Sequence, residues 1–279
     1  MQKQEALSIY PLYELDSTVT PPAEIANGVG VISNNIDLQK INKTNVSKED
    51  ARHLADPKLC LQVNENVIPP EEASIAFIVS CRLLKRTKVF IRYRVDSSNE
   101  VRKIRDDYPF VTSRNVTTEI KGQEFKKIAK LYLGLNEFKA LNKRTGNAAY
   151  FLGMAYRSRG WLECLIFHVC ALETLTSASN REGKITQKFK ERIHNFIGYD
   201  KDKLEKIYNI RSELVHGRYS YSSAKQNLKL FRIAEEVSRK VFSKILLNPK
   251  HLKAFVSDSS RMKLFKKRER HCKAPMLLR

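Results

Sequence analysis

The first 120 residues alternate between short extended patterns and short helical ones. An extended segment covers Ser8 to Leu15, and the Pro21-Pro22 pair marks a turn after it. Ser47 is a good helix cap and is followed by two acids, which predicts a helix through Leu54. The Pro69-Pro-Glu-Glu run starts a second helix, whose apolar positions continue to Leu84.

The residues after this helix have the period of a half-buried strand. From Lys88 to Val95 the apolar side chains alternate, which predicts one apolar face made of Val89, Ile91, Tyr93 and Val95. A second strand is expected from Val111 to Glu119. We therefore expect residues 1–120 to form a small α+β domain, in which we find no catalytic motif.

From Lys121 onward the apolar spacing is helical almost throughout. After a first helix, a turn is expected at Thr145-Gly-Asn, and a long helical stretch follows from Ala148 to Thr176 with a break at Gly160. Two further helices are expected over Lys184 to Ile197, closed by Gly198, and over Ser222 to Leu247. The protein is thus expected to be mainly α, with an up-and-down bundle over residues 121–250. Residues 251–279 read as a basic C-terminal tail that forms a helix on a partner or on RNA, or stays disordered.

The most informative segment lies between the helices expected over Lys184 to Ile197 and over Ser222 to Leu247. It is a helix whose apolar stripe starts at Leu204. Asp200 or Asp202 can cap its start, and Gly217 is the residue type that ends helices. Arg211 lies on the apolar stripe, seven residues after Leu204, and His216 lies about 140° around the helix from Arg211.

This pair can carry chemistry. A guanidinium on a core-facing stripe needs an anion, because an unpaired buried charge is costly. A histidine at a frayed helix end meets solvent, and imidazoles exchange protons near neutral pH. Arg211 and His216 together supply a phosphate clamp and a proton shuttle. The alternative is structural, with Arg211 paired to a glutamate and His216 capping the last carbonyls.

Glu173 is a candidate partner for the arginine. It lies on the same helical face as Leu162, eleven residues earlier, so its carboxylate needs a cation. We expect an ion pair with Arg192 or Arg211 that fixes the helix register, or, in a functional version, a carboxylate that orients Arg211 or tunes His216.

Composition adds an expected ligand. The net charge of +21 attracts polyanions, of which nucleic acid is the commonest, although scattered lysines that only aid solubility would give the same number. The 42% hydrophobic residues suit a globular protein with a sizeable core. Five unevenly spaced cysteines predict reduced thiols in a cytoplasmic protein. The N-terminus has no apolar segment of a signal peptide, and the longest apolar run is too short to span a bilayer.

We expect neither a metal nor a cofactor. Cys164 and His168 are four residues apart on a helix with Cys170 nearby, but a zinc site needs three or four convergent ligands and no matching partner set occurs.

Three segments in order carry a family resemblance: ALETL, then KITQKFKERIHNFIG, then LEKIYNIRSELVHG, which starts about thirty residues after ALETL. From Asn147 to Asn248 the chain resembles the HEPN superfamily, and in particular its Apea-like group with an R-x4-H motif. In active families the residue after the arginine is usually Asn, Asp or His, whereas here it is the polar Ser212.

The resemblance implies a HEPN-type homodimer whose two motifs face each other, and a metal-independent endoribonuclease. Arg211 would stabilise the transition-state charge and His216 would transfer the proton, with Ser212 and Glu173 in support and Arg218 and Tyr219 beside the RNA. It also implies a toxin or antiphage-defence effector that acts on RNA. We hypothesise that residues 1–120 sense a trigger or regulatory partner, or restrain the nuclease.

Two alternatives stay open. Ser212 keeps alive a non-catalytic HEPN-like module that binds RNA or protein. In some HEPN proteins a His-x-Tyr tyrosine receives a nucleotide from a transferase. Here the first tyrosine, Tyr219, follows His216 by three positions and so misses that spacing by one.

Overall fold

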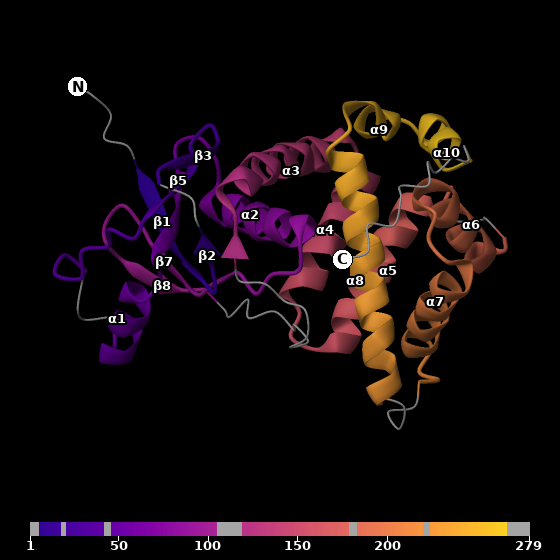
Figure 1. The fold of residues 1–279 in the computed structure, drawn as a ribbon, viewed down its shortest axis with the longest axis horizontal. Helices are drawn as coiled ribbons and strands as arrows, with labels where there is room; N and C mark the ends of the chain where they lie inside the picture. Colours follow the sequence, from indigo (N-terminus) through magenta and orange to yellow (C-terminus); the bar gives the residue numbers. More distant parts are fainter. Residues whose placement is uncertain are drawn as a thin grey trace, which may run out of the picture. The chain divides into compact units, whose positions relative to one another are not determined.

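The computed structural model describes residues 6–17, 21–41, 46–104, 119–178, 183–219 and 224–266. The chain divides into two compact units. Residues 1–137 and 156–160 form the first, here called the N-terminal unit, and residues 138–155 and 161–279 form the second, the C-terminal unit. The described residues are mainly helical, with a small antiparallel sheet near the N-terminus (Figure 1), which confirms the predicted class at that level.

An antiparallel sheet forms the centre of the N-terminal unit, in the strand order β3-β4-β5-β1-β7-β8. Its central pair joins β1 and β5, with Tyr10 opposite Leu61. A short β6 also pairs with β1, and β2 pairs in parallel with β9. The bounds are β1 Leu7–Tyr13, β2 Asp16–Ser17, β3 Ala23–Ala26, β4 Val29–Ser33, β5 Leu59–Asn64, β6 Phe90–Ile91, β7 Tyr93–Val95, β8 Val101–Lys103 and β9 Glu119–Ile120.

Both helices predicted for this unit are present. Helix α1 covers Lys48–Ala55, and the Ser47 side chain accepts a hydrogen bond from the Asp50 backbone N–H, a cap that stabilises a helix by about 1 kcal/mol. Helix α2 covers Pro70–Leu84 and packs on β5 (Figure 1). The extended segment at Ser8 is confirmed as β1, whereas β3, β4 and β5 were not predicted.

The strand predicted from Lys88 to Val95 is interrupted at Arg92, and this corrects its expected face. Tyr93 and Val95 pack with Leu54 of α1 in one core cluster. Ile91 instead lines a hollow beside α2, so the apolar side chains of this segment do not share one face. The irregular residue at Arg92 shifts the two-residue alternation between β6 and β7. Of the predicted strand from Val111, only Glu119 lies within the described residues.

Helix α3 covers Gly122–Leu141 and α4 covers Lys143–Arg157. The turn between them is at Asn142, three residues before the expected Thr145, because the Asn142 carboxamide accepts hydrogen bonds from the backbone N–H groups of Arg144 and Thr145. The boundary between the two compact units falls inside α3, after residue 137, whereas the expected domain boundary at residue 120 precedes this helix. Amphipathic spacing identifies a helix but does not tell which core it joins.

Four longer helices build the C-terminal unit: α5 Trp161–Thr176, α6 Ile185–Ile197, α7 Lys201–Val215 and α8 Ala224–Leu246. The predicted break near Gly160 and the predicted stop at Gly198 are both confirmed. Helix α5 contacts α6, α7 and α8, and its Leu165, Val169 and Leu172 are fully buried. Figure 1 shows α7 and α8 side by side, and the two helices are in contact.

The expected basic tail begins as part of the core rather than as a free extension. Residues Pro249–Ala254 form α9 and Asp258–Lys266 form α10, which contacts α6. Phe255 and Phe265 are buried, and Arg261 is only 1% exposed. Apolar residues at this spacing bury one helix face even in a basic segment. Residues 267–279 lie outside the described part of the chain.

Among the described helices, none combines the length and the apolar composition that a bilayer crossing requires.

The cysteines within the described residues are free thiols: Cys60, Cys81 and Cys164 are buried, and Cys170 is half-buried. Burial raises the pKa of both Cys60 and Cys81 to about 12, because it disfavours the thiolate.

We expect that Cys60 and Cys81 stay unlabelled by iodoacetamide at pH 8 in the folded protein and react fully in urea, since the thiolate is the nucleophile. Peptide mass spectrometry of both samples measures this. Equal labelling of Cys60 in the folded and unfolded protein would contradict the described packing.

Candidate functional site

Helix α7 carries the two candidate catalytic residues. Asp200, one of the two expected caps, accepts a hydrogen bond from the Lys203 backbone N–H. At the other end the Arg218 N–H donates to the Glu213 carbonyl at 2.8 Å, and Gly217 has a positive φ of 67°. This closure is typical of a helix that ends at a glycine. It places His216 in the cap position, directly after the last helical residue.

Arg211 pairs with Glu173 of α5, one of the two expected partners. Nη2 of Arg211 lies 2.9 Å from Oε2 of Glu173, and the two side chains are 21% and 20% exposed. The other carboxylate oxygen of Glu173 accepts a hydrogen bond from the Tyr208 hydroxyl at 3.1 Å. The Arg211 guanidinium also lies 5.9 Å from the centre of the Tyr208 ring. One carboxylate on α5 thus holds two side chains one turn apart on α7.

Burial is the largest single influence on Arg211 and opposes its charge, but Glu173, Cys170 and Tyr208 together outweigh it, so the pKa of Arg211 shifts upward. Burial, together with the same carboxylate, raises the pKa of Tyr208 to about 12. Cys170 lies one turn before Glu173, with Sγ 3.9 Å from Nη2 of Arg211. Burial raises the pKa of this thiol although Arg211 opposes the shift. The arginine is therefore a permanent cation and its neighbours Tyr208 and Cys170 are neutral proton donors near pH 7.

Arg192, the other expected partner of Glu173, donates instead to the Thr176 carbonyl at the end of α5. Arg144 of α4 donates to the carbonyls of Thr174 and Ser177 at 3.1 and 3.0 Å. Arg261 of α10 donates to Ser177 at 2.9 Å and also to Leu175. Three guanidiniums thus satisfy the carbonyls that a helix C-terminus leaves open, where the helix dipole also favours cations.

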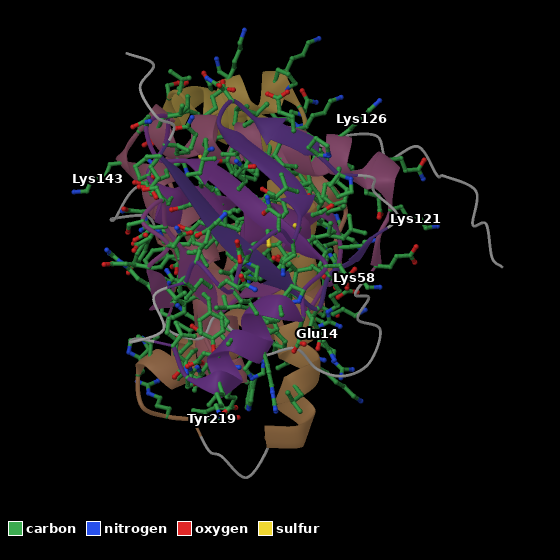
Figure 2. All side chains as sticks on the ribbon, turned by 90° about the vertical axis from the view of Figure 1, so that its left-hand side faces the viewer. Glu14, Lys58, Lys121, Lys126, Lys143 and Tyr219 are labelled. Atoms are coloured by element: carbon green, nitrogen blue, oxygen red, sulfur yellow. The ribbon has the colours of Figure 1, made fainter. Side chains whose placement is uncertain are left out.

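A hollow of about 530 Å³ lies beside this helix end in the C-terminal unit. Among the described residues, its cations are Lys143, Arg144 and Arg211, and its one carboxylate is that of Glu173. Lys143 is exposed and extends from the surface (Figure 2). The full lining is Lys143, Arg144, Asn147 and Phe151 of α4, Cys170, Glu173 and Thr174 of α5, Ser177, and Arg211 of α7.

Arg211 keeps donors available for a ligand. Both of its contacts, to Glu173 and to Cys170, use Nη2. Within the part of the chain that the structure describes, Nη1 has no hydrogen bond or ion pair, whereas the Nε that also has no partner is buried. A guanidinium has five N–H donors in a planar fork, which suits a phosphate. The arrangement can therefore bind an anion at the hollow without giving up the ion pair.

His216 does not line this hollow. Its side chain is exposed, and among the described residues it has no ion pair or hydrogen bond. Ser212 is half-buried, and Arg218 is exposed. Tyr219 is half-buried, with its ring 6.4 Å from that of Trp161 in an edge-on contact; Figure 2 labels it. The structure thus brings Arg211 and Glu173 together and leaves His216, Arg218 and Tyr219 outside that cluster.

The sequence interpretation missed four residues of the site. Tyr208 could have been found, since it lies three residues before Arg211 on the same helix face. Cys170 lies three residues before Glu173 by the same rule. Lys143 and Arg144 had no local signal, because only the tertiary fold brings the start of α4 to the end of α5. His168, considered as a metal ligand, is buried with its ring 6.3 Å from that of Phe231.

Fold and site together define a mainly helical protein with a hollow lined by three basic side chains among the described residues. No protein-family model, curated protein or solved structure matches the chain. The resemblance to the HEPN superfamily therefore stays a prediction that depends on the residues of α5, α6 and α7.

We expect that Glu173→Gln lowers the free energy of unfolding by about 1–3 kcal/mol, because it leaves the Arg211 guanidinium half-buried without its anion. Urea unfolding followed by circular dichroism measures the change. In a double-mutant cycle, Glu173→Gln and Arg211→Gln should couple by roughly 1 kcal/mol or more. The exposed Lys240–Glu236 pair is the control and should couple by about 0.5 kcal/mol or less. Equal coupling energies in the two pairs would contradict the interpretation that Glu173 holds Arg211 in place.

Proposed function

We propose that this protein is a metal-independent endoribonuclease of HEPN type, with its helical unit as a HEPN-like bundle that acts as a homodimer. One observation carries the proposal: α5 fixes Arg211 at a basic hollow, while the exposed His216 follows on the same helix. A fixed cation and an accessible proton carrier are the two groups that the reaction needs. The net charge of +21 supports a polyanionic substrate.

In this proposal the hollow binds the RNA backbone. Arg211 contacts the scissile phosphate through the donors that Glu173 does not use. Lys143 extends over the same hollow and neutralises a neighbouring phosphate. Arg144 contributes charge but is held by backbone carbonyls, so its role is positional. Ser212, half-buried next to Arg211, supports the motif, and Arg218 and Tyr219 lie at the exposed end of α7 for contacts along the RNA.

In this proposal a second copy of the chain completes the active site. His216 does not line the hollow of its own chain, so a complete site requires the α7 ends of two chains to meet. Val215, next to His216, is 54% exposed, which suits a surface that a partner covers.

The chemistry follows from these roles. The substrate 2′-hydroxyl attacks the adjacent phosphorus and loses its proton to a base, and the P–O5′ bond breaks as the leaving oxygen gains a proton. His216 takes part in one of these proton transfers, while Arg211 stabilises the charge on the non-bridging oxygens. The products carry a 2′,3′-cyclic phosphate and a 5′-hydroxyl. The attacking group belongs to the RNA, so no protein nucleophile is needed.

We further propose a biological role as a cytoplasmic toxin or antiphage-defence effector that attacks host or viral RNA. The N-terminal unit would sense a trigger or a regulatory partner, or restrain the nuclease. The alternative is a non-catalytic HEPN-like module for RNA or protein binding. It is favoured by Ser212 and by the ion pair that engages Arg211.

We expect that the purified protein cleaves RNA in EDTA, that His216→Ala lowers the rate by about 10²–10⁴-fold, and that Arg211→Ala lowers it by about 10²–10³-fold. Gel electrophoresis of end-labelled RNA measures the rates. His53→Ala, at a surface position on α1, is the matched control and should cleave as the parent protein does. Equal cleavage by all variants would exclude the site, and RNA binding without cleavage by any would favour the binding module.

We expect that Val215→Asp weakens self-association and cleavage together by tenfold or more, because it places a charge in the covered surface. Sedimentation velocity measures the monomer–dimer equilibrium. The matched control is Val256→Asp, at a valine that is 63% exposed after α9, and it should leave both properties unchanged. A Val215→Asp protein that dimerises and cleaves normally would refute this arrangement.

A further inference from the structure

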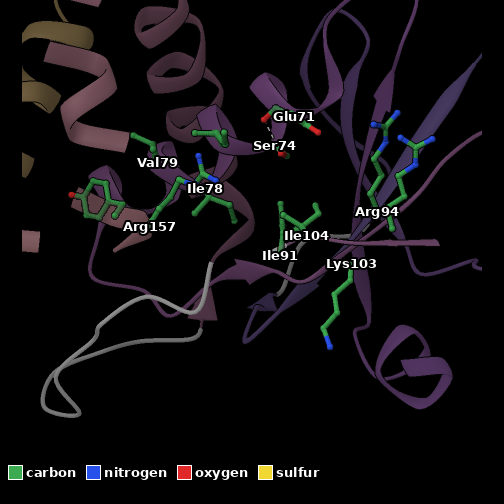
Figure 3. Close-up of a pocket in the computed structure, with 12 residues that line it drawn as sticks. Glu71, Ser74, Ile78, Val79, Ile91, Arg94, Lys103, Ile104 and Arg157 are labelled. Atoms are coloured by element: carbon green, nitrogen blue, oxygen red, sulfur yellow. Dashed lines mark hydrogen bonds between the residues drawn. The ribbon is translucent and has the colours of Figure 1, made fainter. Parts of the chain in front are cut away.

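A second hollow lies in the N-terminal unit, apart from every residue of the proposed nuclease site. It has a volume of about 360 Å³ and lies between α2 and the β7–β8 end of the sheet (Figure 3). Volumes of roughly 300–1,000 Å³ are typical of small-molecule sites. The hollow results from the packing of the helix on the sheet. Helix α2 lies on β5, and β7 and β8 lie farther along, at the end of the strand order.

One part of the hollow is apolar. Ile75, Ile78 and Val79 line it from α2, and Ile91 and Ile104 line it from the sheet side, where Figure 3 shows these last two close to each other. Ile78, Val79 and Ile91 are buried in the surrounding core, which makes this wall part of the fold rather than a loose surface. Such a surface binds a hydrocarbon or an aromatic ring.

The other part of the hollow is cationic. Arg94 and Arg102 are directly opposite each other on the antiparallel strands β7 and β8, and both line the hollow. Like charges in this register destabilise a strand pair unless an anion lies between them. Arg94 is balanced by Glu65, with Nη2 and Oε1 3.1 Å apart, and by the Ser8 hydroxyl.

Arg102 is balanced much less well. Its Nη2 lies 3.7 Å from the largely buried Asp96 and 3.6 Å from the exposed Glu100, and its own side chain is 63% exposed. Ion pairs of an exposed guanidinium at such distances contribute little. Arg157 adds a further guanidinium to the lining, and among the described lining residues the one carboxylate is Glu71 of α2. The cross-strand arginine pair is therefore the part of the hollow suited to a negative group.

We propose that this hollow binds a small amphipathic carboxylate, with its apolar body against the isoleucines and its carboxylate at the Arg94–Arg102 pair. A bound carboxylate would relieve the repulsion across the two strands and accept charge-assisted hydrogen bonds from Arg102. A highly charged nucleotide fits less well, since the lining residues that the structure describes include five aliphatic side chains and one aromatic, Tyr156. The proposal does not depend on the nuclease, although a ligand site here would supply the N-terminal unit with a trigger to sense.

Equilibrium dialysis of the full chain with radiolabelled octanoate, and with octan-1-ol as its neutral counterpart, tests this. We expect saturable binding of one octanoate per chain, and binding of octan-1-ol that is about tenfold weaker or more, since a charge-assisted hydrogen bond contributes about that factor. Arg102→Gln should remove this preference for the carboxylate, and Arg102→Lys should retain part of it.

Lys58 provides a control cation in the same unit, because it is exposed and is not part of the lining of the hollow. Lys58→Gln should therefore change octanoate affinity less than twofold. For the apolar part, Ile75→Asp should abolish binding of both ligands, whereas Leu133→Asp, at an exposed leucine of α3, should not. Circular dichroism checks that each variant is folded. Absence of octanoate binding, equal affinity for octan-1-ol, or equal losses in Arg102→Gln and Lys58→Gln would each overturn the proposal.

Discussion

Four arginine side chains converge on the last turns of α5, and the C-terminal unit is organised by these contacts. Arg144, Arg192 and Arg261 come from α4, α6 and α10 and donate to the carbonyls that the helix end leaves open. Arg211 comes from α7 and pairs with the Glu173 carboxylate one turn earlier. The N–H donors of a guanidinium lie in one plane, so their hydrogen bonds form only when the acceptors lie in that plane. Each contact therefore restricts the position of the helix that supplies the arginine.

This constraint also decides what the site can do. The three outer arginines are engaged by backbone carbonyls, and burial together with Arg144 lowers the pKa of Arg261 to about 10. Arg211 is different, because its contacts among the described residues are to side chains through Nη2 and to the Tyr208 ring, and Nη1 has no hydrogen bond or ion pair. The structural interpretation of the arginine and the functional one are therefore compatible. The ion pair orients the guanidinium, and the hollow beside it gives a phosphate access to it.

The sequence predicted much of this for local reasons and failed where tertiary contacts decide. The caps at Ser47 and Asp200 and the stop at Gly217 each need only neighbouring residues. The Glu173–Arg211 pair followed from charge on two apolar stripes.

The basic hollow could not be predicted, because Lys143 reaches it only through the fold. The predicted face for Ile91 was wrong, because one irregular residue, Arg92, shifts the alternation of side chains along the strand. The basic segment around Arg261 was expected as a tail, since a buried guanidinium cannot be recognised without its carbonyl partners.

In the proposed reaction, Arg211 and His216 promote attack by a hydroxyl that belongs to the substrate. A DNA oligonucleotide that contains a single ribonucleotide isolates this requirement, with mass spectrometry of the product ends in EDTA. We expect one cut, directly 3′ of the ribose, leaving a 2′,3′-cyclic phosphate on one product and a 5′-hydroxyl on the other. Cleavage at deoxyribose positions, or products that end in a 3′-hydroxyl, would contradict it.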